Sequence, residues 1–149
     1  MESKAKQNGG LSIEYKISAN EIINLFKGRN NTICLYTSFR DTKREQPSFY
    51  HCHRNFMTKN QCIDLMKNLA ILQNYLQIQD NETDRMTYHL QVSDIERITI
   101  FTGKDKKVGL FTSNEDASGK LFKSGYFFMD HNQCTAFSQK LQIMINSCE

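Results

Sequence analysis

The sequence predicts an α+β fold made of two ββββα repeats, whose curved antiparallel sheets pack as an intramolecular pseudo-dimer. Two observations support this prediction: the chain repeats itself, and each copy changes from strand-like alternation to helical spacing at the same point. Eight residues between Ser18 and Ser38 recur 75 positions later, and eight more between Phe56 and Asn74 recur 72 positions later. Identities in two constant registers indicate a diverged duplication. The change of register falls in residues 39–55, where a loop can absorb three residues.

The duplication also predicts the domain organisation. A unit of about seventy residues buries only a marginal core by itself, so we expect the copies to share one pseudo-symmetric domain. The expected segments are a disordered leader at 1–10, a first repeat at 11–76, a linker at 77–85 and a second repeat at 86–149.

The first copy begins with alternation. Leu11, Ile13, Tyr15 and Ile17 alternate with polar residues, which predicts a half-buried strand over 11–18. Further strands are predicted at 21–27, 32–40 and 48–57, with a turn at 27–31 and a basic loop at 41–47. We expect the glycine and asparagines of the turn to supply positive φ. Thr58 is a helix N-cap residue, and the apolar spacing behind it predicts a helix over 59–76.

The second copy repeats this order. Alternation begins at Met86 and returns at Ile98, a glycine-bearing basic turn occupies 103–107, and Val108 starts the third strand. A loop at 114–120 leads to a fourth strand at 121–129, and Asp130 caps a helix whose apolar face runs to Cys148. The agreement between the copies supports the assignment of both.

Composition restricts the class of protein. The chain has no long apolar run, so we expect neither a transmembrane span nor a secretory signal. Without a secretory signal, we expect the five cysteines to be small buried hydrophobic residues in a reducing intracellular compartment. Their spacing contains no Cys-x-x-Cys pair and so matches no zinc site. Between compartments, we expect the nucleus rather than the cytoplasm. A net charge of +3 permits nucleic acid as a partner only where Lys and Arg cluster.

The segments 15–18 and 22–29, which continue into 33–36, resemble the DNA-binding core of the positive cofactor four coactivators. The shared features are an aromatic-x-Ile strand, a Phe-Lys-Gly-Arg turn and a closing helix with glutamine in its first turn. The repeat also resembles the PUR repeat of Pur-alpha and, more loosely, the Whirly proteins. This resemblance implies curved sheets, paired units, and binding of single-stranded DNA or RNA. The second copy departs from the pattern at Thr102, and serines replace the strand glycine at 18 and 93.

The candidate binding residues are aromatic side chains on strands and basic side chains in matching turns. Tyr36 and Phe111 occupy equivalent positions opposite the predicted core face, where they could stack bases or pack between the copies. Matched basic turns could line a groove for phosphates or could simply be solvated. The full predicted set is Lys27, Arg29, Tyr36, Arg40, Lys43, Arg44, Tyr50, Arg54, Lys104, Lys106, Lys107, Phe111, Lys120 and Lys123.

The sequence offers little for catalysis or metal binding. His51 and His53 could share a metal, but two imidazoles without a third ligand are weak evidence. No nucleophile, carboxylate pair or phosphate-binding glycine loop stands in a recognisable frame. We therefore predict a protein that is not an enzyme and has no cofactor or metal.

The predicted function is largely sequence-independent binding of single-stranded nucleic acid, with DNA preferred over RNA and no membrane partner. The alternative is a protein–protein interaction or assembly module on the same duplicated scaffold. Further self-association or a protein partner is left open.

Overall fold

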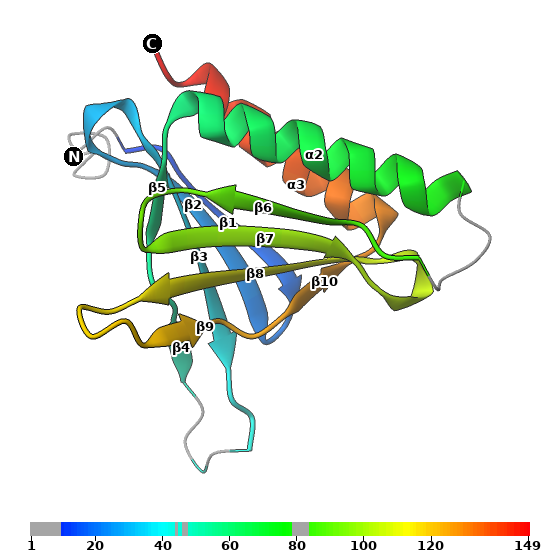
Figure 1. Cartoon of the computed structure of the whole chain (residues 1–149), viewed down its shortest axis with the longest axis horizontal. Helices are drawn as coiled ribbons and strands as arrows, with labels where there is room; N and C mark the ends of the chain where they lie inside the picture. The colour runs from blue at the N-terminus through cyan, green and yellow to red at the C-terminus, as the bar shows by residue number, and fades with distance from the viewer. Residues whose placement is uncertain (1–9, 44, 46–47, 79–83) are drawn as a thin grey trace.

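The computed structural model describes residues 10–43, 45, 48–78 and 84–149, and it contains two antiparallel sheets, each followed by a helix (Figure 1). Sheet A comprises β1 (Ser12–Ser18), β2 (Glu21–Lys27), β3 (Ile33–Arg40), β4 (Phe49–His51) and β5 (Asn55–Met57). Sheet B comprises β6 (Thr87–Gln91), β7 (Glu96–Thr102), β8 (Val108–Glu115), β9 (Leu121–Lys123) and β10 (Phe127–Met129). The helices are α2 (Lys59–Ile78) and α3 (His131–Asn146). The predicted α+β class with a duplicated ββββα order is confirmed.

The expected leader and linker fall largely outside the described part of the chain. Residues 1–9 of the leader and 79–83 of the linker are not among the described residues. Helix α2 extends two residues beyond the predicted end at Leu76. Among the described residues, no helix has the length and apolar character needed to cross a membrane.

Each predicted fourth strand is divided in two by a β-bulge. On β3, Ser38 pairs with His51 and Leu35 pairs with Asn55, so three steps along β3 correspond to four steps along its partner. Sheet B has the same offset, between the pairs Ser113–Lys123 and Leu110–Phe127. The extra residue lies opposite Tyr36 in sheet A and opposite Phe111 in sheet B. A bulge bends the strand and redirects a side chain, which alternation alone does not predict.

The turns between the second and third strands obtain positive φ from residues other than glycine. Asn30 and Asn31 in the first turn, and Asp105 and Lys106 in the second, have φ between 57° and 64°. Gly28 and Gly103 are extended. A Cβ at Gly28 would lie 2.9 Å from the Phe56 ring, and one at Gly103 would lie 3.0 Å from the Phe128 ring. A Cβ at Gly28 would also lie 2.4 Å from Thr32 Oγ1, so close packing by a ring and, at Gly28, by a hydroxyl explains the glycines. The predicted positive φ at the first-turn glycine is wrong.

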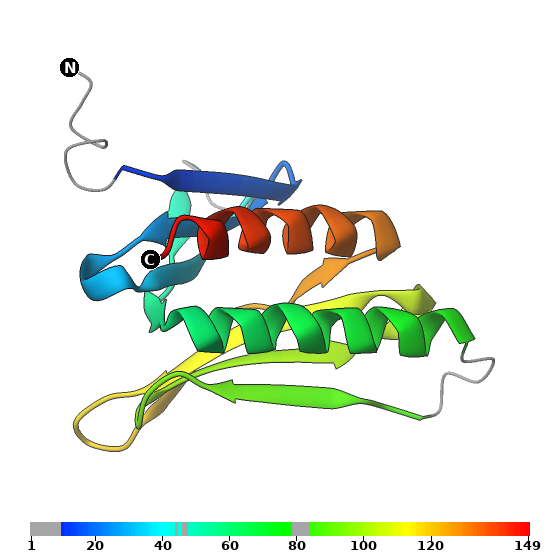
Figure 2. The same cartoon turned by 90° about the horizontal axis from the view of Figure 1, so that it is seen from above.

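The two helices are exchanged between the repeats. Helix α2 of the first repeat lies against β6 and β7, and α3 of the second repeat lies against β1 and β2 (Figure 2). The helices run antiparallel, side by side, with β1 beyond α3 and β6 beyond α2 (Figure 2). Each repeat thus supplies the helix that covers the other repeat's sheet.

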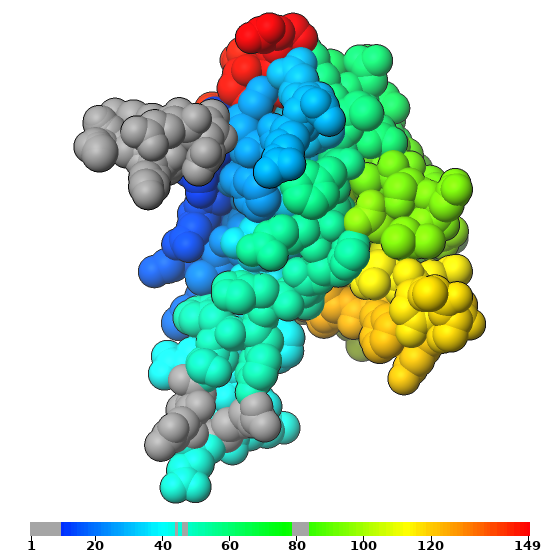
Figure 3. All heavy atoms as spheres, turned by 90° about the vertical axis from the view of Figure 1, so that its left-hand side faces the viewer, coloured from blue at the N-terminus to red at the C-terminus, as the bar shows by residue number. Residues whose placement is uncertain are grey.

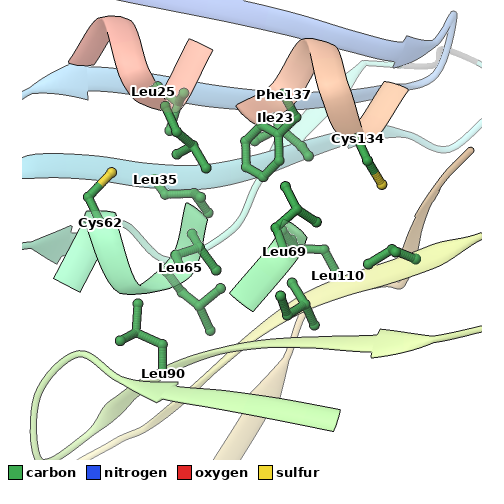
Figure 4. Close-up of a cluster of buried hydrophobic side chains, with 14 of the residues drawn as sticks. Ile23, Leu25, Leu35, Cys62, Leu65, Leu69, Leu90, Leu110, Cys134 and Phe137 are labelled. Carbon is green, nitrogen blue, oxygen red and sulfur yellow. The ribbon is translucent and has the colours of Figure 1, made fainter. Parts of the chain in front are cut away.

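One apolar core fills the space between both sheets and both helices. Leu65 and Leu69 of α2, with Phe137 of α3, meet Leu35 of sheet A and Leu110 of sheet B (Figure 4). These side chains have no more than 1% of their surface exposed. Burial on this scale across both copies explains how two units of marginal size form one stable body.

A recurring glutamine links each helix to the opposite repeat. Gln133 completes a capping box with Asp130 and donates from Nε2 to the Ile17 carbonyl at 3.1 Å. Gln61 accepts from the Thr58 amide at 2.9 Å and donates to the Val92 carbonyl at 3.2 Å. Both side chains thus orient a helix start and hold the first strand of the other copy.

Candidate nucleic-acid interface

The face of each sheet that points away from the helices carries a cluster of aromatic rings. In sheet A the Phe26 ring centroid lies 6.1 Å from that of Tyr36 and 6.0 Å from that of Phe56. In sheet B the Phe101 centroid lies 6.0 Å from that of Phe111 and 5.8 Å from that of Phe128. Side chains on one face of a strand alternate with those on the other, so these rings lie opposite the core residues of their strands. We call these two surfaces the outer faces.

The β-bulges place a further side chain over each cluster. Arg54 follows the bulge in sheet A, and its guanidinium lies 4.7 Å from the Tyr36 ring centroid. Tyr126 holds the equivalent position in sheet B, with its ring centroid 5.1 Å from that of Phe111. Lys123 covers Phe111 from another direction, with Nζ 4.7 Å from the centroid. The predicted rings are therefore partly covered by cationic groups of the protein.

Sheet B has an open hollow of about 690 Å³ on its outer face. Four aromatic rings line it together with polar residues, and its basic residues include Lys104 of the η2 turn (Lys104–Lys106) and the adjacent Lys107. Its lining residues are Arg85, Thr87, His89, Thr99, Phe101, Thr102, Gly103, Lys104, Asp105, Lys107, Phe111, Tyr126 and Phe128. This volume lies within the usual range for small-molecule sites, about 300–1,000 Å³.

A second hollow recurs at matched positions on both sheets. In sheet A it has a volume of about 540 Å³ and includes Lys16, Arg40 and His51. In sheet B it has a volume of about 290 Å³ and includes Arg97 and Lys123. Carboxylates accompany these cations, Glu14 in sheet A and both Asp94 and Glu115 in sheet B, so the two hollows are polar with mixed charge.

Hydrogen bonds hold the polar floor of these hollows. Asn24 donates from Nδ2 to Ser38 Oγ at 2.9 Å, and Ser38 Oγ lies 2.7 Å from His51 Nδ1. In sheet B, His89 Nδ1 lies 2.9 Å from Thr99 Oγ1. Asn24, Ser38 and Thr99 are buried although they point away from the core. Satisfied buried polar groups fix side-chain orientation, so each floor is a rigid surface.

Two predicted phosphate-binding lysines contact helix ends. Lys27 Nζ donates to the Ser147 carbonyl beyond α3 at 3.1 Å, and Lys106 Nζ donates to the Leu76 carbonyl of α2 at 2.7 Å. A cation is favourable at a helix C-terminus. Both contacts join one repeat to the helix of the other, so these lysines have a structural role. Their predicted phosphate contact stays a prediction.

The other predicted residues fall into two groups. Arg40, Arg54, Lys104, Lys107 and Lys123 lie on the outer faces with Tyr36 and Phe111. The remaining ones lie on turns or at the distal parts of the sheets. Arg29 lies in η1 (Arg29–Asn31), and the exposed Lys43 lies in the β3–β4 loop. The Tyr50 ring centroid lies 5.4 Å from that of Phe39, and Lys120 Nζ lies 5.2 Å from the Phe122 ring centroid. Arg44 lies outside the described residues.

Several residues of the sheet B hollow were missing from the sequence prediction. Phe101 and Phe128 recur as Phe26 and Phe56 in the first copy, and that identity was a usable signal. The sequence prediction places Arg85 in the linker, whereas in the structure it lines the hollow and donates to the Thr102 carbonyl at 3.4 Å. No sequence signal reveals that the chain after α2 returns to the hollow of sheet B.

The two histidines do not converge. His51 contacts Ser38 on the outer face, whereas His53 pairs with Glu96 of the other repeat. The bulge separates their directions. Within the part of the chain that the structure describes, no three His, Cys, Asp or Glu side chains are arranged to hold a metal ion.

Apolar side chains are also exposed away from the aromatic clusters. In sheet A, Phe39 and Phe49 lie at the distal end of β3 and on β4, with 37% and 38% of their surface exposed. In sheet B, Leu121 and Phe122 on β9 are 56% and 45% exposed. Figure 3 shows a notch between the projecting β3–β4 region and the β8–β9 hairpin.

Comparison with known proteins identifies a structural neighbour but no family. No family model and no curated protein sequence matches this chain, so none of the three resemblances is confirmed. The fold is similar to a chain in the crystal structures of MRP1/MRP2 from Trypanosoma brucei, with a TM-score of 0.50 and 10% sequence identity. The alignment covers 91% of this chain and 82% of that chain. At this level of identity the likeness concerns the fold.

Proposed function

We propose that this protein is a non-enzymatic single-stranded nucleic-acid-binding protein that uses the outer faces of its two sheets. The main support is the combination, on both outer faces, of clustered rings with adjacent basic side chains. Tyr36 lies beside Arg54, and Phe111 lies beside Lys123. Rings can stack on bases of any sequence, and basic groups can neutralise phosphates without reading sequence.

Binding of an unpaired strand requires the cations over the rings to move or to stack with the bases. Arg54 and Lys123 have flexible side chains at the surface, and an arginine plane can stack on a base as an aromatic ring does. Bases in a duplex are already stacked on one another, so duplex binding should rely mainly on phosphate contacts and be weaker. We propose DNA over RNA as the preferred strand.

A salt titration tests this proposal. Fluorescence anisotropy of labelled 20-nucleotide oligothymidine and oligouridine should show binding that weakens steeply between 50 and 200 mM salt. Replacing Lys104 by Gln should reduce the log–log salt slope by about 0.7, the value for one contact with a single strand. Lys67→Gln on α2 is the matched control for loss of one positive charge. No binding at 50 mM salt would refute the proposal.

The competing proposal is a protein–protein assembly module. The observation in its favour is the matched exposure of apolar side chains at Phe49 and Leu121, at equivalent positions of the two repeats. Exposed apolar clusters commonly mark interaction sites. Light scattering distinguishes the proposals: concentration-dependent association abolished by Phe49→Ser and Leu121→Ser, without oligonucleotide binding, would favour assembly.

A further inference from the structure

The outer faces of the two repeats differ at the hollow of sheet B, although they descend from the same unit. The difference begins with Gly109. A Cβ at this position would lie 2.3 Å from the Phe101 ring, so the ring lies directly on the strand backbone. The equivalent residue in the first repeat is Cys34, which is buried. In the second repeat, the absence of a side chain allows Phe101 to form a flat floor.

The wall of the hollow also differs. Tyr126 and Phe111 face each other with an interplanar angle of 46°, and Tyr126 is 49% exposed. Arg54 takes the place of Tyr126 in sheet A, over the Tyr36 ring. Both sheets have a cationic side chain over a ring, Arg54 in sheet A and Lys123 in sheet B, but only sheet B adds a second ring, Tyr126, at the position that Arg54 occupies in sheet A.

The charge of the hollow is asymmetric in the same direction. Arg85, Lys104 and Lys107 line it with one carboxylate, Asp105. The matching positions of the first repeat are Gly10, Arg29, Thr32 and Asn30, with one cation among them. His89 lies at the edge of the hollow where the first repeat has Glu14, which would repel an anion.

We propose that the sheet B hollow binds one unstacked nucleotide, with its base among Phe101, Phe111 and Tyr126 and its phosphate at the Lys104–Lys107 end. Thr87, His89 and Thr99 line the hollow and provide polar groups for the base edge. A concave site that combines four aromatic rings with polar groups and cations matches a planar ring joined to an anion. The basic side chains of the first repeat contact mainly the phosphates of the bound nucleic acid. This proposal rests on the proposed function and assigns different roles to the two repeats.

The test uses short probes that span only one site. Aromatic ¹H–¹³C NMR of the full chain is recorded with 5′-phosphorylated trithymidylate, thymidine 5′-monophosphate and deoxyribose 5-phosphate. Signals of Phe111 and Tyr126 should shift with both thymidine ligands, and the signal of Tyr36 should not. Deoxyribose 5-phosphate should bind at least tenfold more weakly than the monophosphate. Equal affinity for deoxyribose 5-phosphate and thymidine 5′-monophosphate would overturn the proposal, as would equal chemical-shift changes at Tyr36 and Phe111.

Substitutions that convert one repeat into the other provide the matched pair. Tyr126→Arg introduces the first-repeat residue and should weaken trithymidylate binding about 5- to 150-fold, the equivalent of one lost base stack. Arg54→Tyr at the matching position should change it less than twofold. If Tyr126→Arg does not fold, Lys107→Thr serves as a second variant. It also introduces the residue found at the matching position of the first repeat. Unchanged trithymidylate binding in a folded Tyr126→Arg protein contradicts the proposal.

The 20-nucleotide probe separates this inference from the proposed function. Binding of the 20-mer without binding of the short probes refutes the nucleotide hollow and leaves the proposed function standing. Binding of thymidine monophosphate without the 20-mer supports the hollow and refutes the single-strand function.

Discussion

The exchanged helices predict that a cavity in either helix destabilises the whole chain. Leu69 of α2 and Leu141 of α3 are equivalent residues of the repeat, and both are completely buried in the shared core. Truncating a fully buried leucine to alanine costs about 3–5 kcal/mol, because the methyl groups lose their contacts and the site collapses only in part. Native proteins have a total free energy of unfolding of about 5–15 kcal/mol. Leu69→Ala or Leu141→Ala should therefore remove a large share of it.

Urea unfolding, followed by far-ultraviolet circular dichroism and by tyrosine fluorescence, measures this effect. Both signals should show one coincident transition in the parent and in each variant, shifted to lower urea by a similar amount. Ile71→Ala and Ile143→Ala are matched controls on the solvent side of the same helices, where 50% and 49% of each side chain is exposed. These controls should lose less than about 1 kcal/mol. Two separate transitions, only one of which moves in Leu69→Ala, would refute the shared core.

Three further predictions concern the contacts between the repeats and the buried thiols. Gln133→Ala should cost about 1–2 kcal/mol in urea unfolding, because it removes half of a capping box and the bond to β1; a loss below 0.3 kcal/mol would show that water replaces these bonds. Lys106→Met should lower the free energy of unfolding by about 1 kcal/mol, because it removes the contact with the C-terminus of α2. If this loss disappears at high salt, its origin is electrostatic. Burial raises the pKa of the thiols of Cys34, Cys62 and Cys134 from 9.0 to about 12, so the unfolded chain ionises first and stability should fall as the pH rises from 9 to 12. A thermal midpoint that stays level over this range would contradict that assignment.

The fold class and the element order could be predicted from the sequence because the periodicity of side chains is local. Alternation from Leu11 and helical spacing after Thr58 each depend on residues within a few turns or pairs. The duplication strengthened each assignment, since a second copy tested the first. The β-bulges were missed because an extra residue opposite Tyr36 becomes visible only when the partner strand is in register.

The candidate site was only partly predictable. Tyr36 and Phe111 could be assigned to the outer faces from alternation, and Arg54, Lys104 and Lys107 could be listed as basic. Which basic groups contact the protein itself depends on distant parts of the chain: Lys27 meets the Ser147 carbonyl, 120 residues away, and Lys106 meets the Leu76 carbonyl, 30 residues away.

The sequence was sufficient to establish that one unit occurs twice and what secondary structure it forms, because these follow from spacing along the chain. The exchange of helices and the inequality of the two outer faces were decided by packing. An apolar helix face is equally complementary to either sheet, so periodicity cannot say which one it covers. Gly109 in the second repeat replaces Cys34 of the first. The consequence of this replacement is visible only in the structure, where the Phe101 ring lies directly on the backbone at Gly109.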